Sequence, residues 1–366
     1  MVHAARRYGE RWGERMARKR LLRLAALGVA VGVLLPVAGS ASGLSQDPDD
    51  GMSPGARTYL TKVLDLMEQH SVMRHRVDWA LLRRRVVEQA HGARTAADTY
   101  GVIAWALNSL GDGHSFFLNP QQSGERLGAT TLVFEGLTGR ALDDGLGYVS
   151  LPQVQGTQQT YDAYVRQGRA AVATADGAGA CGWIVDLRDN RGGNMWPMLA
   201  VLGPVLGDGP AGGFMDADGN RSTWSIQHGN AYLDGEPMGR TDSQPIARSA
   251  PPVAVLISHR TGSSGEAVAV AFRGRAGTRF FGEPTYGVPT GNMVVHLSDG
   301  ATLGLTTVDD VDRAGRTYNG RIRPDEEVDN DPAAAVGGDR DRVLAAAQAW
   351  LHQQPGCQRS RGSQAG

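Results

Sequence analysis

Lysine is nearly absent from this chain of 366 residues, which has only Lys19 and Lys62. Lys19 falls in a basic N-terminal stretch, and Lys62 falls in a segment whose apolar spacing predicts a helix. A lysine can activate a serine hydroxyl, but it must lie desolvated beside that nucleophile. Neither lysine is well placed for this, so we expect any catalytic base to be one of the nine histidines.

Cysteine is equally scarce, with Cys181 and Cys357 alone. Two cysteines do not make a metal site, and we expect neither a metal nor a cofactor. In an exported protein the pair could form a disulfide that ties the C-terminal tail to the start of a core strand. Two unpaired thiols are the alternative, and the sequence leaves both open.

The net charge is low, at −1, but it is unevenly distributed. Residues 1–41 carry eight arginines and lysines against Glu10 and Glu14, so the remainder holds 29 basic and 36 acidic residues. An acidic body disfavours binding to nucleic acid. It would suit a cationic peptide better.

The N-terminal apolar run, residues 24–35, is too short to span a bilayer, which takes about 20 apolar residues. A basic stretch precedes the run, and Pro36 and the small residues 38–41 follow it. This order is typical of a secretory signal peptide, with an uncleaved anchor as the alternative. We therefore expect residues 1–41 to be a signal peptide or membrane anchor and residues 42–53 a linker. The protein would be extracytoplasmic, whether periplasmic, secreted or membrane-associated through its N-terminus.

Apolar residues recur at helical spacing between residues 54 and 110. Asp78 and Thr95 precede two further helical segments, and Gly111 is a natural helix stop. We therefore expect an N-terminal helical subdomain over residues 54–118.

The pattern beyond residue 119 alternates short strands with helices, which is typical of an α/β core. Strands are expected at residues 129–135, 146–151, 182–187, 253–258, 279–281, 293–297 and 302–308. Helices are expected at residues 158–173, 195–206, 264–273 and 339–352. The segment 207–250, rich in Gly, Asp and Ser, is expected to be a long loop. The α/β core would cover residues 119–352, followed by a flexible tail at 353–366.

Ser263 stands where a buried-strand pattern, residues 252–258, turns into the packed helix pattern of residues 264–273. A helix N-terminus leaves N–H groups unsatisfied and a positive local potential, which can stabilise an oxyanion. The N–H of Ser264 is the natural donor. The same window also fits a capping box in which Glu266 reaches back to the cap, and taken alone it favours that interpretation.

Gly192 and Gly193 end the segment 186–193, which follows a strong strand pattern. A glycine pair can adopt backbone conformations closed to other residues and present an N–H group to an anion. The charged side chains of this segment are expected to brace the turn. An ordinary strand-to-loop turn is the alternative.

His114 lies just past the last early helix, between the small residues Gly111 and Gly113, which would leave its ring accessible. A lone histidine in a turn is more often a surface residue. His259, four residues before Ser263, is the competing candidate for a base.

Four motifs occur in a characteristic order. They are Asp-Leu-Arg-x-Asn-x-Gly-Gly at residues 186–193, Thr-x-Ser-x-x-Glu at 261–266, Gly-Glu-Pro-Thr-Tyr-Gly at 282–287 and Ile-x-Pro-Asp at 322–325. Together they resemble the tail-specific (C-terminal processing) serine protease family, over roughly residues 55–350. The resemblance implies a crotonase-like (ClpP/crotonase-type) α/β core and hydrolysis of peptide bonds.

Many members of that family carry a catalytic lysine directly after the third motif, where this chain has Val288. The departure excludes the serine–lysine branch and leaves the histidine branch, which is similar to the tricorn core and the nisin-resistance-type peptidases. In that branch a histidine in a turn after the N-terminal helices is the base, which matches His114. Gly113 and Tyr318 stand where a tricorn-type tetrad would have a serine and a glutamate, so a dyad is expected.

The resemblance also implies a role for each matching residue. The residues it assigns are Ser263 as nucleophile, His114 as base, the N–H groups of Ser264 and of Gly192 or Gly193 as the oxyanion hole, and Glu266 and Asp112 in support.

We therefore predict an exported serine peptidase that hydrolyses peptide bonds of a polypeptide through a Ser–His dyad, without a metal. Substrates are expected to bind extended, in a groove roofed by the N-terminal helices and the 207–250 segment. A non-catalytic lipid- or retinoid-type binding protein on the same fold, or an esterase, is the alternative.

Overall fold

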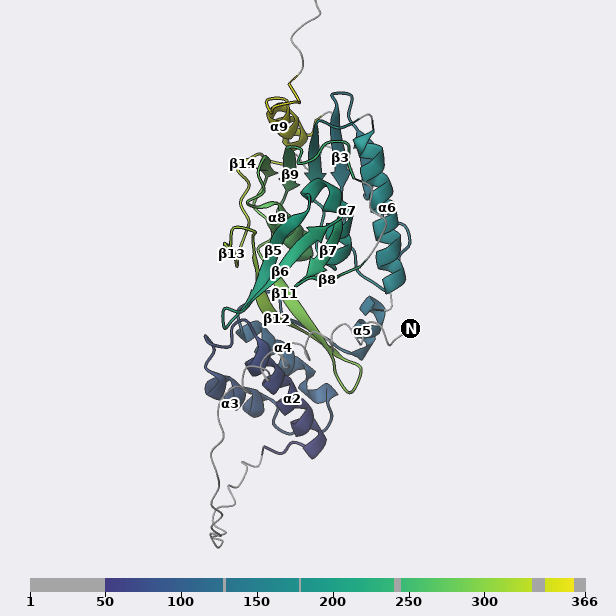
Figure 1. The fold of residues 1–366 in the computed structure, drawn as a ribbon. Helices are drawn as coiled ribbons and strands as arrows, with labels where there is room; N and C mark the ends of the chain where they lie inside the picture. The colour runs from purple at the N-terminus through teal and green to yellow at the C-terminus, as the bar shows by residue number, and fades with distance from the viewer. Residues whose placement is uncertain (1–49, 128–129, 178, 240–244, 331–339, 359–366) are drawn as a thin grey trace, which may run out of the picture.

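The computed structural model describes residues 50–127, 130–177, 179–239, 245–330 and 340–358. Within these ranges two β-sheets and their helices form a mixed α/β fold (Figure 1). The predicted signal or anchor segment, most of the linker and the end of the tail lie outside them. No helix in the described ranges is long and apolar enough to cross a membrane.

The first sheet carries the strands that precede two of the motifs. Its order is β14-β10-β9-β4-β3-β2, and neighbouring strands run parallel except for β2 and β3. The strands are β2 (Thr138–Ala141), β3 (Leu146–Ser150), β4 (Gly182–Asp186), β9 (Val253–Ile257), β10 (Thr278–Gly282) and β14 (Glu326–Glu327). Every residue of β4 and β9 is buried, as expected for central strands of a parallel sheet covered on both faces.

Helices supply that cover. Val255 and Ile257 of β9 pack into a cluster with α6, α7 and α8, whereas Ala254 and Leu256 pack with α9 on the opposite face. The alternation along one strand therefore divides the core into two layers. The four helices are α6 (Gln158–Asp176), α7 (Met195–Leu206), α8 (Ser264–Phe272) and α9 (Arg342–Leu351).

The second sheet is antiparallel and is built around β12, which pairs with four other strands. The order is β1-β12-β5-β6-β7-β8, with β11 and β13 also paired to β12. The strands are β1 (Phe116–Leu118), β5 (Gly209–Asp216), β6 (Arg221–Gln227), β7 (Asn230–Leu233), β8 (Glu236–Pro237), β11 (Thr290–His296), β12 (Thr302–Val311) and β13 (Thr317–Tyr318). Because α8 contacts β11 and β12, this sheet lies against the helix that follows Ser263.

The early helices pack on the end of the second sheet, where their apolar faces join Leu303 and Leu305 of β12 in one cluster. They are α2 (Pro54–His70), α3 (Trp79–Gln89), the 3₁₀ turn η1 (Ala97–Thr99) and α4 (Tyr100–Ser109), whereas α5 (Pro120–Leu127) contacts β1 and has no residue in that cluster. Ser53 and Asp78 cap α2 and α3 through their side chains. Figure 1 shows α2, α3 and α4 at one end of the molecule and α9 at the other.

Two predicted elements are wrong. The expected loop 207–250 contains β5, β6, β7 and β8. The turn-forming residues between these short, partly exposed strands made the whole segment resemble a loop. Within the expected strand 129–135, residues 130–135 form no strand. Leu132 and Val133 there are exposed, so the β-branched run found no neighbouring strand to pair with. The other predicted strands and helices are present with shifted ends.

Cys181 and Cys357 form a disulfide, which settles the alternative that the sequence left open. The bond joins the residue before β4 to the segment after α9, across 176 residues of sequence. Cys357 is buried in the α9 cluster.

Candidate active site

Ser263 occupies the sharp turn between β9 and α8, in a backbone conformation that side-chain-bearing residues rarely adopt. Its φ is +52° and its ψ is −121°. The turn is held from both sides, because the Gly262 N–H donates to the Asn190 carbonyl and the Ser263 N–H donates to the Glu266 carboxylate. Strained backbone of this kind persists only where the surroundings over-determine it, and it is common at active sites.

The hydroxyl of Ser263 makes no side-chain cap hydrogen bond with the described residues. The Glu266 arm of the predicted capping box is present, since the Glu266 carboxylate accepts the Ser263 N–H at 2.9 Å. The backbone N–H of Glu266 donates to the Ser263 carbonyl at 2.8 Å. The capping box that the sequence window favoured is therefore present, although the Ser263 hydroxyl itself makes no cap hydrogen bond.

The Gly192–Gly193 loop lies directly against Ser263. A Cβ added to Gly192 would stand 2.8 Å from the Ser263 Cβ, and one added to Gly193 would stand 1.9 Å from the Val154 carbonyl oxygen. Both glycines also have positive φ, at +109° and +108°. Steric contact and backbone conformation thus both require glycine at these two positions.

The N–H groups around Ser263 differ in whether they are occupied. Gly192 donates its N–H to the Asn190 side chain at 3.0 Å. The N–H groups of Gly193 and Ser264 have no hydrogen-bond partner in the described part of the chain. The Ser264 hydroxyl donates to the Gly193 carbonyl at 2.7 Å, which joins these two residues. Of the two predicted glycines, Gly193 is therefore the one with a free donor.

The loop that carries these glycines is braced by buried charge. Arg188 forms ion pairs with Asp186 and Asp341, each with a closest N–O distance of 2.6 Å. The carbonyl of Arg188 accepts the Ser258 hydroxyl at the end of β9. Asp186 and Arg188 therefore brace the turn, whereas Asp189 forms an exposed ion pair with Arg260.

Glu266 is completely buried and accepts four hydrogen bonds, from the N–H groups of Ser263, Gly287 and Val288 and from the Thr285 hydroxyl. Burial raises the pKa of its carboxyl, although the four donors oppose that shift. The carboxylate thus ties the Ser263 turn to the irregular segment 285–288.

His114 sits in a tight turn that Asp112 organises. One oxygen of the Asp112 carboxylate accepts the N–H groups of His114 and Ser115 at 2.9 and 2.7 Å. The imidazole Nδ1 lies 2.7 Å from the Thr290 hydroxyl oxygen at the start of β11. Burial lowers the pKa of the His114 imidazole, so the ring is neutral and able to accept a proton near pH 7.

The predicted residues therefore form two connected groups. Ser263, Ser264, Gly192, Gly193 and Glu266 are in direct contact at the end of β9. The second group, His114 and Asp112, is joined to the first through β11 and the segment before it.

The competing histidine has another partner. His259 Nδ1 lies 2.8 Å from the Glu283 carboxylate, and its side chain is 64% exposed.

Three further residues at the site were not predicted from the sequence. Thr290 contacts the His114 ring, Asn190 holds the Gly192 N–H, and Tyr286 packs its Cβ beside Gly262 while remaining 61% exposed. Asn190 and Tyr286 are motif positions and could have been found there. Thr290 lies outside every motif, and only the fold brings it to His114.

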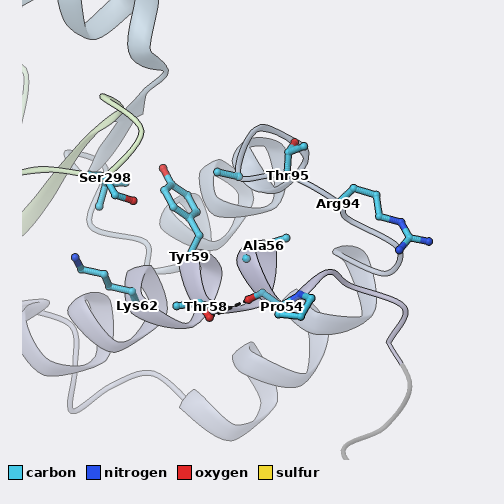
Figure 2. A pocket seen from close by; sticks show the side chains of 11 residues that line it. Pro54, Ala56, Thr58, Tyr59, Lys62, Arg94, Thr95 and Ser298 are labelled. Carbon is cyan, nitrogen blue, oxygen red and sulfur yellow. Dashed lines mark hydrogen bonds between the residues drawn. The ribbon is translucent and has the colours of Figure 1, made fainter.

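A separate pocket of about 670 Å³ lies between α2, the segment around Arg94 and the turn from β11 to β12 (Figure 2). Tyr59, Lys62 and Ser298 are among the residues that line it, and none of the predicted catalytic residues does. Over the described ranges no group of three or more His, Cys, Asp or Glu side chains could hold a metal ion.

Comparison with known families fits this geometry. A family model described as peptidase family S41 matches residues 145–328, half of the chain, and includes both the Gly–Gly loop and the Ser263 turn. The protein is therefore a hydrolase of the serine-peptidase class. It belongs to peptidase family S41, which confirms the resemblance seen in the motifs.

Two curated relatives are similar over different lengths. The nisin-resistance protein of Lactococcus lactis subsp. lactis is 27% identical over 285 residues, which cover 77% of this chain and 86% of that protein. The chloroplastic carboxyl-terminal-processing peptidase 2 of Arabidopsis thaliana is 28% identical over 179 residues, covering 47% of this chain and 31% of that protein.

Solved structures share the fold. A lipoprotein from Streptococcus agalactiae superposes with a TM-score of 0.66 at 23% identity, covering 82% of this chain and 97% of that one. The photosystem II D1 C-terminal processing protease superposes with a TM-score of 0.54 at 17% identity, covering 76% and 94%.

Proposed function

We propose that this serine peptidase is exported and cleaves peptide bonds with Ser263 as nucleophile and His114 as general base. The observation that carries the proposal is the turn at Ser263. A strained serine lies at a helix N-terminus, against a glycine loop whose Gly193 N–H has no partner in the described residues. The S41 family membership makes a protein or peptide the substrate.

The proposed chemistry follows from the donors and acceptors present. The Ser263 hydroxyl attacks the scissile carbonyl carbon while His114 takes its proton. The oxyanion receives the N–H groups of Ser264 and Gly193, because the Gly192 N–H is held by Asn190. His114 then donates its proton to the leaving amine, and water hydrolyses the acyl-enzyme by the same steps in reverse order.

Three further proposals concern the context of the site. We infer that the chain is organised as a crotonase-like core with a helical subdomain over residues 54–118. The N-terminal segment would direct export or anchor the protein in a membrane, and the buried disulfide supports an oxidising compartment. Peptide substrates, with cationic ones favoured, would bind extended between the early helices and strands β5–β8; the relative named for nisin resistance supports a peptide.

Two single substitutions test the assignment. Ser263→Ala and His114→Ala should each lower kcat for peptide cleavage on the order of 10³-fold or more. His259→Ala serves as the matched control, because this histidine is exposed and paired with Glu283, and it should keep near-normal activity. Thermal unfolding should show all three variants folded. Near-normal cleavage by either of the first two variants, or loss in the third alone, would refute the assignment.

A further inference from the structure

We propose that Thr290 is a positioning residue of the site, whose hydroxyl accepts the Nδ1–H of His114 and so keeps the Nε2 lone pair free as the base. The proposal rests on the proposed function, because it concerns the same histidine. It assigns the orienting role, which a carboxylate often fills, to a neutral hydroxyl on β11.

The contacts of His114 leave Thr290 as the group that orients its ring. The backbone N–H of His114 donates to Asp112, and its carbonyl accepts the Asn292 side chain at 3.2 Å. The ring itself has one hydrogen-bond partner in the described residues, the Thr290 hydroxyl at 2.7 Å from Nδ1. The main-chain hydrogen bonds fix the backbone position of His114, and the contact with Thr290 fixes the orientation of its imidazole ring.

Asp112 is the nearby carboxylate that could have filled this role, and its oxygens are already engaged. Oδ1 accepts the N–H groups of His114 and Ser115, and Oδ2 accepts the Ser115 hydroxyl. The carboxylate therefore holds the turn rather than the ring. Burial is the largest influence on the pKa of His114 and lowers it. The negative charge of Asp112 favours the imidazolium and the positive charge of Arg126 disfavours it, and both effects are smaller than that of burial.

A hydroxyl that accepts from Nδ1–H suits both protonation states of the ring. In the neutral imidazole one nitrogen carries hydrogen and the other a lone pair, and in the imidazolium both carry hydrogen. If Thr290 accepts from Nδ1–H, this bond persists while Nε2 gains and loses the proton. The ring then need not turn or change tautomer during a catalytic cycle.

Thr290 is also tied to the nucleophile through backbone. Its N–H donates to the Val288 carbonyl at 2.8 Å, and the Val288 N–H donates to Glu266 at 2.9 Å. The same Glu266 oxygen accepts the Ser263 N–H. One short series of hydrogen bonds thus links the residue that orients the base to the turn that carries the hydroxyl.

The test uses the purified protein and three variants. Thr290→Val keeps the branched shape and removes the hydroxyl, Thr290→Ser keeps the hydroxyl, and Thr317→Val is a matched control on β13, where Thr317 is half-buried. We expect Thr290→Val to lower kcat by about 10- to 100-fold with KM changed less than about twofold. Thr290→Ser should recover most of that loss, and Thr317→Val should resemble the unmodified protein.

A second readout does not depend on activity. Long-range ¹H–¹⁵N NMR of the His114 ring, assigned by comparison with His114→Gln, should show the Nδ1–H tautomer in the unmodified protein and in Thr290→Ser. Thr290→Val should shift the ring toward the Nε2–H tautomer. This shift would support the role of Thr290 even if Ser263→Ala left cleavage intact and the proposed function failed.

Two results would overturn the proposal. One is an unchanged His114 tautomer in folded Thr290→Val, whatever its activity. The other is a Thr290→Ser variant as impaired as Thr290→Val, because a role of the hydroxyl predicts rescue. If Thr290→Val does not fold, the tautomer and the acid limb of kcat/KM in Thr290→Ser decide instead. In Thr290→Ser we expect the Nδ1–H tautomer, and we expect the acid limb of the kcat/KM profile to lie below pH 6.5, the ordinary pKa of histidine. The Nε2–H tautomer in this variant would overturn the assignment.

Discussion

Single atoms decide the geometry around Ser263. Any side chain at Gly192 would press on Ser263, because a Cβ added to this glycine would stand 2.8 Å from the Ser263 Cβ. The same glycine has a φ of +109°, where side-chain-bearing residues are strained. A substitution of Gly192 should therefore have two effects, a loss of activity from the contact with Ser263 and a loss of stability from backbone strain. A control glycine that has only the strain separates the two.

We expect Gly192→Ala to lower kcat/KM at least about 100-fold, because the added methyl displaces the nucleophile or the loop beside it. The matched control is Gly145→Ala in the turn between β2 and β3, which has a φ of +81° and nothing within 4 Å of the added Cβ. The control should lose about 1 kcal/mol in urea unfolding from backbone strain and keep its activity. Equal activity in the two variants would mean that the contact with Ser263 has no catalytic consequence.

The sequence predicted the residues that share a motif with their neighbours. Ser263, Glu266 and Gly193 are set by local turns, so their types and spacing carry the signal. Thr290 was missed because its contact with His114 joins positions 176 apart in the chain. The choice between Gly192 and Gly193 also needed the fold, since it depends on which N–H the Asn190 side chain already holds.

At the scale of the element, β12 organises the second sheet and contains an unusual buried carboxyl group. Asp310 is completely buried, and neither of its carboxylate oxygens has a hydrogen-bond partner in the described residues. Its backbone N–H donates to the Pro289 carbonyl, directly before Thr290. Burial, with the charges of Glu266 and Asp309, raises the pKa of Asp310 well above its ordinary value of 3.8.

The raised pKa predicts how stability depends on pH. The folded state favours the protonated Asp310, so this contribution is fully present below pH 3.8 and is lost as the pH rises through the folded-state pKa. Asp310→Asn stays neutral and should match the unmodified protein below pH 3.8. Its unfolding free energy should exceed that of the unmodified protein by about 1.4 kcal/mol more for each pH unit between 3.8 and the folded-state pKa, and by a constant amount above that pKa. Urea unfolding across pH measures this, with exposed Asp162→Asn as the control. Parallel curves for the two proteins would contradict the prediction.

Elements were predictable where one physical signal dominated. The apolar runs of β4 and β9 and the helically spaced apolar residues of α2 are such signals, and these three elements were predicted. Strands β5–β8 were missed because Trp224 and Ile226 alternate with polar residues between glycine-rich turns, a pattern shared with loops. The expected strand at 129–135 shows the converse. Its residues 130–135 form no strand, because β-branched residues do so only where a neighbouring strand offers an edge to pair with.

At the scale of the whole molecule, the disulfide between Cys181 and Cys357 links the C-terminal segment to the parallel sheet. It fastens the segment after α9 to the start of β4, on the side of the parallel sheet opposite α8. The 176-residue separation makes the constraint on the unfolded chain large. Because α9 packs on one face and the Ser263 turn follows β9 toward the other, this bond should affect stability more than chemistry.

The double variant Cys181→Ala, Cys357→Ala should therefore lose about 2–5 kcal/mol of unfolding free energy. Its kcat/KM should stay within about threefold of the unmodified protein at a temperature where both are folded. Urea unfolding and peptide cleavage on the same samples test both statements. The prediction is wrong if activity falls strongly in the folded double variant or if stability is unchanged.

Covalent labelling by a fluorophosphonate probe tests the central claim most directly, because an activated serine reacts and an ordinary hydroxyl does not. Mass spectrometry of the digested protein should find the adduct on Ser263. Labelling should be strongly slowed in His114→Ala and unchanged in His259→Ala. An unlabelled Ser263 in the folded protein, as a binding protein on this fold would give, or labelling that is indifferent to His114, would contradict the account.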